Sequence, residues 1–193
     1  MKDLRESKSF GQPIIKLDEV SINRIAAGEV VERPAAAIKE LIENAVDAQA
    51  GSIKVSFSHG GKTLIKVIDN GWGIRKEEMR LALTSHATSK MHQIDLSSIK
   101  TLGFRGEALP SIAAVSKLTL KSRTTTASEA TEINYRSGKF IEMKPVALSS
   151  GTTVEVLDLF YSTPARLKFL KSNRSETQAI FDTVKRLALS NPQ

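Results

Sequence analysis

The chain has 193 residues, and its 28 lysines and arginines against 21 aspartates and glutamates give a formal net charge of +7. It contains no cysteine, which excludes a disulfide scaffold, a thiolate zinc site and a cysteine nucleophile. The length and the hydrophobic share of 40% predict one globular domain with its own core. The positive charge is compatible with an anionic partner, such as nucleic acid, a nucleotide or an acidic membrane surface, and equally with a role in solubility alone.

The N-terminal segment 1–12 is charged and lacks the apolar run of an export signal. No apolar stretch approaches the roughly 20 residues that a membrane span requires. We therefore expect a cytoplasmic protein without a membrane partner. Residues 1–14 are expected to form a flexible arm, and residues 15–193 a single domain.

The first half of the chain predicts helices around one hairpin. A short helix at 18–27 ends at Gly28, and Pro34 suits the first turn of a second helix that runs to about residue 48. Alternating apolar residues predict a hairpin with strands at 53–57 and 63–68. The other elements expected in this half are a short helix at 77–83, a long irregular stretch at 85–106 and a helix at 107–115.

Strands dominate the second half of the chain. The expected strands cover 117–123, 130–136, 140–144 and 152–159, and the expected helices cover 164–170 and 175–190. The helices come mainly in the first half of the chain and the hairpin-linked strands mainly in the second. This order predicts an α+β fold rather than a parallel βαβ array. We expect a two-layer α/β sandwich, in which a mixed, mostly antiparallel sheet of about six strands carries helices on one face.

Three residues of the second helix form the first candidate site. Glu40, Asn44 and Asp47 follow one another at i, i+4 and i+7, so they project side by side. A carboxylate can take a proton from water, and an amide oxygen one turn away can bind a hard cation such as Mg²⁺. The same spacing is typical of the solvated face of an amphipathic helix, whose apolar face would carry Ile38 and Leu41.

A second candidate site follows the return strand, in the sequence Asp-Asn-Gly-Trp-Gly at 69–73. An aspartate at a strand end can accept a hydrogen bond from a ligand amine, and the two glycines permit backbone shapes that let a ligand approach. The alternative is a tight turn in which Asp69 accepts a hydrogen bond from its own backbone.

A third candidate is the polar region 85–109. Leu102–Leu109 places two glycines three residues apart before a helix, whose first N–H groups can bind an anion, and Ser85–Lys90 adds hydroxyls and a cation. Long irregular segments are typical of lids and binding loops, and an ordinary surface loop is the alternative. Gly61-Lys62-Thr63 is not a P-loop, because Ser56 stands where its first glycine is required and a strand follows.

Taken together, the motifs resemble those of the MutL family of DNA mismatch-repair proteins. The matching segments are Arg24–Glu32 (RIAAGEVVE), Lys39–Ala48 (KELIENAVDA), Asp69–Ile74 (DNGWGI), His86–Lys90 (HATSK), Gly103–Leu109 (GFRGEAL), Gly151–Thr153 (GTT) and Ser162–Phe169 (STPARLKF). Glu-x-x-x-Asn and Asp-x-Gly-x-Gly alone would indicate only the wider ATPase superfamily of DNA gyrase B, sensor histidine kinases and the large heat-shock chaperone. The resemblance implies that superfamily's Bergerat-type fold, an α/β sandwich that holds ATP between its helices and a lid.

The resemblance also implies roles for individual residues in hydrolysing ATP to ADP. Glu40 would be the general base that activates the attacking water, and Asn44 would coordinate the Mg²⁺ that bridges the phosphates. Asp69 would bind the adenine amino group, with Gly73 letting the base approach and Thr153 supporting Asp69 from its strand. The residues implied near the phosphates are Ser89 and Lys90 in the lid, and Leu102, Gly103, Phe104, Arg105 and Gly106 through backbone N–H groups.

The sequence departs from the family pattern at two positions. Ala45 and Gln49 stand where the motif more often has Ser and Gly, and Gln49 removes an easy left-handed cap from the helix end. The chain also stops before the family's second domain, with its lysine for the γ-phosphate, and before the dimerising C-terminal domain. We therefore expect a monomer that binds nucleotide but turns ATP over very slowly. A lid at about 85–102 and the N-terminal arm are expected to become ordered with ATP.

In the full-length family, ATP gates a homodimer that couples mismatch recognition to strand processing. The implied partners are mismatched or single-stranded DNA, a mismatch-recognition protein, an endonuclease and a helicase. The alternative function is a nucleotide-independent DNA-binding module built on the basic residues of 166–174, namely Arg166, Lys168, Lys171 and Arg174. A solvated helix face would have the same composition.

Overall fold

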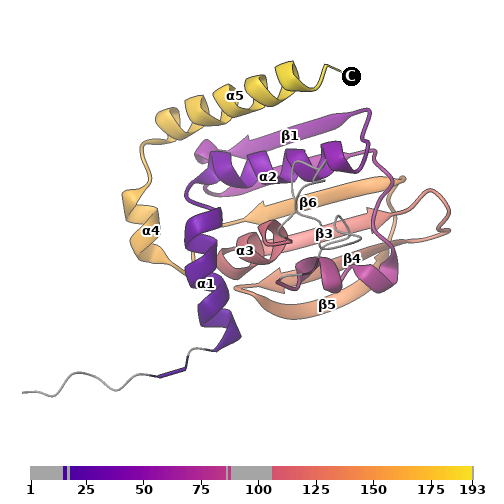
Figure 1. Cartoon of the computed structure of the whole chain (residues 1–193), viewed down its shortest axis with the longest axis horizontal. Helices are drawn as coiled ribbons and strands as arrows, with labels where there is room; N and C mark the ends of the chain where they lie inside the picture. Colours follow the sequence, from indigo (N-terminus) through magenta and orange to yellow (C-terminus); the bar gives the residue numbers. More distant parts are fainter. Residues whose placement is uncertain (1–14, 17, 86, 88–105, 193) are drawn as a thin grey trace, which may run out of the picture.

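The computed structural model describes residues 15–16, 18–85, 87 and 106–192. These residues form two layers, a six-stranded sheet and a set of helices against one of its faces, as the sequence predicts (Figure 1). No helix within these ranges is both long enough and apolar enough to cross a membrane.

All six predicted strands are present, with ends within two residues of the expected positions. They are β1 (Ile53–Ser58), β2 (Leu64–Asp69), β3 (Lys117–Arg123), β4 (Ala130–Arg136), β5 (Lys139–Val146) and β6 (Gly151–Leu157). The strands pair in the order β1-β2-β6-β3-β4-β5, and all five pairings are antiparallel, so the sheet is antiparallel rather than mixed. The last strand lies between β2 and β3, which brings Thr152 opposite Asp69.

The helices are α1 (Glu19–Val30), α2 (Pro34–Asp47), α3 (Ala108–Val115), α4 (Pro164–Phe169) and α5 (Asn173–Ser190). Figure 1 shows α1, α2 and α3 over the same face of the sheet, with α5 running along β1 beyond α2. The longest helix, α5, packs against α2 and against the short turn η1 (His59–Gly61). Phe181 of α5 also meets Phe57 of β1 edge to face, with ring centres 5.8 Å apart.

The core lies between the two layers because apolar residues alternate along the strands. Val67, Leu120 and Ile133 occupy matching positions on β2, β3 and β4 and are at most 2% exposed. They share one buried cluster with Ile38 and Leu41, the predicted apolar face of α2. The helix expected at 77–83 is instead two short 3₁₀ turns, η2 (Lys76–Glu78) and η3 (Leu81–Leu83), around the buried Met79.

The opposite face of the sheet is polar. Ion pairs join neighbouring strands across it, from Lys66 to Glu155 at 3.1 Å and from Lys121 to Glu132 at 2.9 Å. The hydrogen bond from Lys121 lowers the pKa of Glu132, although burial acts in the other direction. Such a surface is stable in water without a helix above it, which explains a two-layer rather than a three-layer fold.

The sequence predicts that the first helix ends at Gly28. In the structure it continues to Val30. Arg166 of α4 reaches its C-terminal end and donates hydrogen bonds to the carbonyls of Ala27 at 3.1 Å, Val31 at 3.2 Å and Gly28. A β-carbon on Gly28 would lie 3.0 Å from the guanidinium. The glycine therefore makes room for a cap that comes from 138 residues further along the chain, which local sequence cannot reveal.

The start of α5 is fixed to the start of α2 by a buried carboxylate. Glu176 is 1% exposed, and its Oε2 accepts hydrogen bonds from Nε and Nη2 of Arg33 at 3.1 and 3.0 Å. Its Oε1 accepts a hydrogen bond from the Lys171 backbone N–H at 3.0 Å. The Lys62 ammonium adds a further link to the Lys171 carbonyl at 2.8 Å. We call these contacts the α5 anchor.

Candidate functional site

The polar side of α2 carries the first group of site residues. The helix starts at Pro34, in the first-turn position where a missing N–H costs nothing. Burial of Ile38 and Leu41 against the sheet turns Glu40 and Asn44 to the other side, where both are half-buried. The Glu40 side chain is 28% exposed. The structure therefore keeps Glu40 and Asn44 one turn apart and partly accessible, as their spacing predicts.

A lysine links the acidic residues of α2. The Lys39 ammonium lies 3.2 Å from Glu40 Oε1 and 2.7 Å from Glu43 Oε2. Glu43 is 6% exposed, so it is buried rather than solvated, although Glu40 and Asn44 beside it on the helix are partly accessible. Burial lowers the pKa of Lys39, but the Glu43 hydrogen bond and the Glu40 charge outweigh that effect and raise it.

Asp69 ends β2 at the rim of the sheet. Its Oδ1 accepts backbone N–H groups from Gly71 at 2.9 Å and Thr152 at 3.2 Å. Burial raises the pKa of Asp69, and these two hydrogen bonds offset part of the rise. Within the described part of the chain, Oδ2 accepts no hydrogen bond. The predicted Asx turn is thus present at one oxygen, while the other oxygen is available to a ligand donor.

The loop after Asp69 is fixed on both sides. The Trp72 N–H donates to the carbonyl of Ala48, at the end of α2, at 3.1 Å. Gly73 has a φ of +75°, and a β-carbon there would lie 2.3 Å from the Arg123 carbonyl oxygen of β3. The glycine is therefore required for backbone packing, a reason that the sequence motif does not indicate. The Trp72 contact joins the Asp69 loop to the helix that carries Glu40 and Asn44.

The support predicted for Asp69 from Thr153 comes instead from Thr152. Thr152 is the register partner of Asp69, whereas Thr153 pairs with Ile68. Side chains of adjacent residues on a strand point to opposite faces, so Thr153 lies on the face opposite that of Asp69. The prediction is off by one residue because the sequence does not reveal the register of β6 against β2.

Ser122 lies beside the candidate site, although the sequence analysis does not single it out. Its hydroxyl accepts the Ile74 N–H at 2.8 Å and lies 2.9 Å from Thr152 Oγ1 and 3.1 Å from the Gly151 carbonyl oxygen. A signal was available, because Ser122 continues the buried alternation of Leu118 and Leu120 on β3 with a polar side chain.

The remaining predicted site residues lie mainly outside the described part of the chain. Those outside are Ser89, Lys90, Leu102, Gly103, Phe104 and Arg105. Gly106 is described and has a φ of +63°, with the Ala87 carbonyl oxygen 2.3 Å from where a β-carbon would be. Among the described residues, no group of three His, Cys, Asp or Glu could hold a metal ion. A cation at Asn44 would therefore depend on phosphate and water oxygens for its other ligands, an arrangement that suits Mg²⁺.

Two cavities lie at this end of the sheet, and the smaller one borders the candidate site at Ser122. The larger, of about 830 Å³, lies between the β3–β4 and β5–β6 connections. The smaller, of about 380 Å³, is lined by Ile74 and Ser122 among others. Neither is lined by Glu40, Asn44 or Asp69, so we place the candidate site by its chemistry rather than by cavity size.

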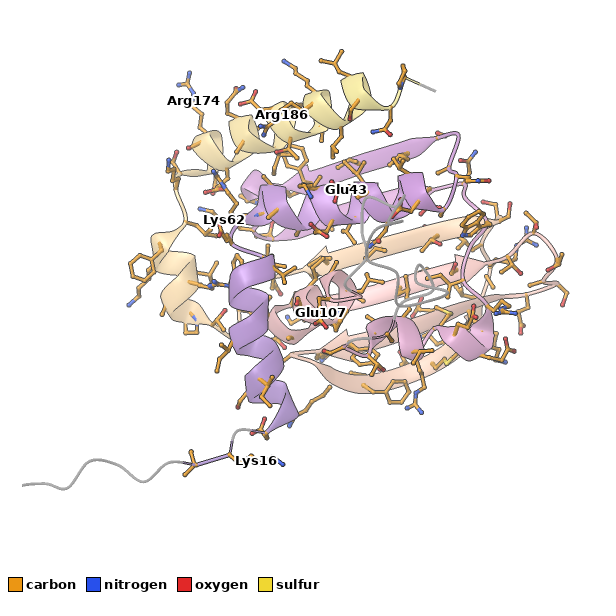
Figure 2. All side chains as sticks on the ribbon, viewed as in Figure 1. Lys16, Glu43, Lys62, Glu107, Arg174 and Arg186 are labelled. Carbon is orange, nitrogen blue, oxygen red and sulfur yellow. The ribbon has the colours of Figure 1, made fainter. Side chains whose placement is uncertain are left out.

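The basic stretch is less available than its sequence suggests. The guanidinium of Arg166 caps α1, and the backbone of Lys171 belongs to the α5 anchor. The side chains of Lys168, Lys171 and Arg174 are exposed, and Figure 2 shows Arg174 pointing away from the domain. A DNA-binding module on this stretch would lack the first of its four predicted residues.

Much of this chain is similar to known proteins. The profile of the "Histidine kinase-, DNA gyrase B-, and HSP90-like ATPase" family matches residues 32–160. The DNA mismatch repair protein MutL of Chelativorans sp. (strain BNC1) is 57% identical over 180 residues, and that of Azorhizobium caulinodans is 56% identical over 179. Each match covers 93% of this chain and 29% of the relative.

The fold is similar to that of solved structures. The Aquifex aeolicus MutL ATPase domain complexed with ADP is 35% identical, with a TM-score of 0.70, over 84% of this chain and 57% of that chain. A structure described as the N-terminal domain of a DNA repair protein is 31% identical, with a TM-score of 0.71, over 84% of this chain and 47% of that one.

The chain belongs to the family of histidine kinase-, DNA gyrase B- and HSP90-like ATPases. Within that family it corresponds to the N-terminal ATPase region of the MutL DNA mismatch repair proteins, as its motifs predict. It spans about 29% of the length of the curated MutL relatives.

Proposed function

We propose that this chain binds ATP and hydrolyses it to ADP and phosphate, with the adenine held at Asp69. The observation that carries the proposal is the asymmetry of that carboxylate. Two backbone N–H groups fix Oδ1, while Oδ2 accepts no hydrogen bond from the described residues. A fixed carboxylate oxygen suits the exocyclic amine of adenine, whereas the carbonyl oxygen of guanine or hypoxanthine would be repelled.

The phosphates would lie toward α2. Asn44 offers an amide oxygen for Mg²⁺, which would neutralise phosphate charge when bound. Glu40, one turn earlier on the helix, would orient the attacking water and accept its proton. The pairing of Glu40 with Lys39 holds the carboxylate at the edge of this face. The ADP complex of the Aquifex aeolicus relative supports a nucleotide ligand.

Calorimetric titration of ADP, with and without Mg²⁺, tests the binding site. We expect Asp69→Asn to weaken ADP binding at least about tenfold under both conditions, because a charge-assisted hydrogen bond is lost and an N–H donor can oppose the amine. Asn44→Ala should weaken binding only when Mg²⁺ is present. Asp182→Asn, on the exposed side of α5, is the matched control and should bind as wild type does. No binding by wild type, or wild-type affinity in Asp69→Asn, would overturn the proposal.

Turnover is tested separately from binding. Glu40→Gln should keep the wild-type affinity for ATP and lose its single-turnover hydrolysis. A hydrolysis rate equal to that of wild type would remove Glu40 as the base.

For the full-length protein, we propose an ATP-gated homodimer that couples mismatch recognition to strand processing. The support is the similarity of this chain to DNA mismatch repair proteins MutL. Its proposed partners are DNA, a mismatch-recognition protein, an endonuclease and a helicase. Failure of a full-length Asp69→Asn variant to lower mismatch repair in cells would contradict the ATP gate.

A further inference from the structure

A row of polar side chains crosses four strands at the Asp69 end of the sheet. Asp69 of β2 lies opposite Thr152 of β6, which lies opposite Ser122 of β3, which lies opposite Thr131 of β4. Ser122 is 2% exposed, Thr131 5% and Thr152 9%. Buried hydroxyl groups are almost always hydrogen-bonded. The hydroxyls of this row must therefore find partners within the sheet, a requirement that apolar side chains at the same positions would not have.

The Ser122 hydroxyl has one proton and two acceptors within reach. Its oxygen already accepts the Ile74 N–H at 2.8 Å. Its proton can go to the Gly151 carbonyl at 3.1 Å or to Thr152 Oγ1 at 2.9 Å. In the first arrangement Thr152 donates its own proton back to Ser122. In the second arrangement Thr152 accepts from Ser122 and its proton is released for another acceptor.

We propose that Ser122 is a positioning residue for recognition of the nucleotide base. It holds the Asp69 loop through Ile74, and by donating to Thr152 it directs the Thr152 proton toward a ring nitrogen of a base bound at Asp69. The resulting chain runs from the Ile74 N–H through Ser122 and Thr152 to the base, with each bond polarising the next. This inference rests on the adenine site proposed above.

The chemistry of the base decides which arrangement is used. Adenine presents an amine beside a ring nitrogen that accepts, which matches an acceptor at Asp69 beside a donor at Thr152. Hypoxanthine presents an oxygen beside a ring N–H and matches neither group. Ser122 would thus contribute to the preference for adenine without touching the base.

The test compares two buried serines. Ser122→Ala leaves the Ile74 N–H without its acceptor, and we expect it to weaken ADP binding about tenfold and to reduce the ratio of ADP to IDP affinity. Ser116→Ala is the matched control, because Ser116 is fully buried and donates to the Ile112 carbonyl at 2.6 Å. It should lower the melting temperature and leave both affinities unchanged. Ser122→Cys, which keeps the shape of serine, replaces Ser122→Ala if the alanine variant does not fold.

A double-mutant cycle separates positioning from a merely structural role. If Ser122 acts through Thr152, Ser122→Ala combined with Thr152→Val should weaken ADP binding by less than the product of the two single effects. A Ser122 variant that melts earlier but keeps the wild-type affinities and their ratio would overturn the inference while Asp69→Asn still weakens binding. Wild-type affinity in Asp69→Asn would instead overturn the adenine site, and the inference with it.

Discussion

Two carboxylates of this domain, Glu176 in the α5 anchor and Asp69 at the sheet rim, are held in opposite ways. Glu176 is 1% exposed and both of its oxygens are bonded, one to the Arg33 guanidinium and the other to a backbone N–H. From the described residues, Asp69 receives only neutral N–H groups, both at one oxygen, and burial raises its pKa. The difference indicates that the anchor carboxylate serves stability, whereas the rim carboxylate carries a charge whose burial opposes folding, with one oxygen that accepts no hydrogen bond from the described residues.

The largest effect on stability is expected at the anchor. Glu176→Ala should lower the free energy of unfolding by about 2–3 kcal/mol, less than for a fully enclosed pair because the Arg33 side chain is 35% exposed and can be rehydrated. Urea denaturation measures the loss, and ADP titration of the folded variant should give the wild-type affinity. Weaker ADP binding at unchanged stability would reverse the roles assigned to the two carboxylates.

The Arg166 cap should behave as a second structural contact. Arg166→Ala should lower the free energy of unfolding by about 2 kcal/mol, since hydrogen bonds to charged groups are lost. Gly28→Ala should destabilise wild type by crowding the guanidinium, but stabilise Arg166→Ala by up to about 1 kcal/mol through helix propensity. Chemical denaturation of the four proteins tests this cycle. A reduced salt dependence of DNA binding in Arg166→Ala would instead assign this arginine to DNA.

A substitution of Gln49, at the end of α2, should increase the stability of the protein. Gln49 follows α2 with a φ of +56°, so it takes the left-handed cap conformation that a glycine adopts without strain. Gln49→Gly should raise the free energy of unfolding by roughly 0.5–1 kcal/mol. Gln49→Ala keeps the β-carbon and should give no such gain. Equal stabilities of the glycine and alanine variants would show that the strain is absent.

The smallest effect concerns pH. Because the folded-state pKa of Asp69 lies above its unfolded value, the folded chain takes up the proton first as the pH falls. As the pH falls from neutral to about 4, wild type should therefore gain stability relative to Asp69→Asn. Urea denaturation of both proteins across this range gives the difference, and the opposite slope would mean that the carboxylate is stabilised rather than strained.

The sequence predicts the parts of the fold that depend on local pattern. Apolar alternation locates all six strands, and Pro34 with the apolar face of α2 locates the helix that carries Glu40 and Asn44. The Asp69 loop is also visible, because glycine and asparagine after a strand favour a turn.

What local pattern cannot predict depends on contacts between distant segments. The end of α1 past Gly28 is capped by Arg166 from the far end of the chain, and the pairing of Asp69 with Thr152 rather than Thr153 depends on the register of β6 against β2. The burial of Glu43 beside the accessible Glu40 and Asn44 is likewise not visible in the spacing of charged residues along α2. Ser122 is recognisable only once its strand neighbours are known.

Trp72 gives the Asp69 loop an optical property of its own. It is the only tryptophan in the chain, it is 55% exposed, and its backbone is tied to the end of α2. All tryptophan fluorescence of the chain therefore originates three residues from Asp69. Changes in the intensity and the wavelength of maximum emission would therefore report on the nucleotide end of the domain without an added label. Unfolding that begins at α5 would change the fluorescence only once it extends to this loop.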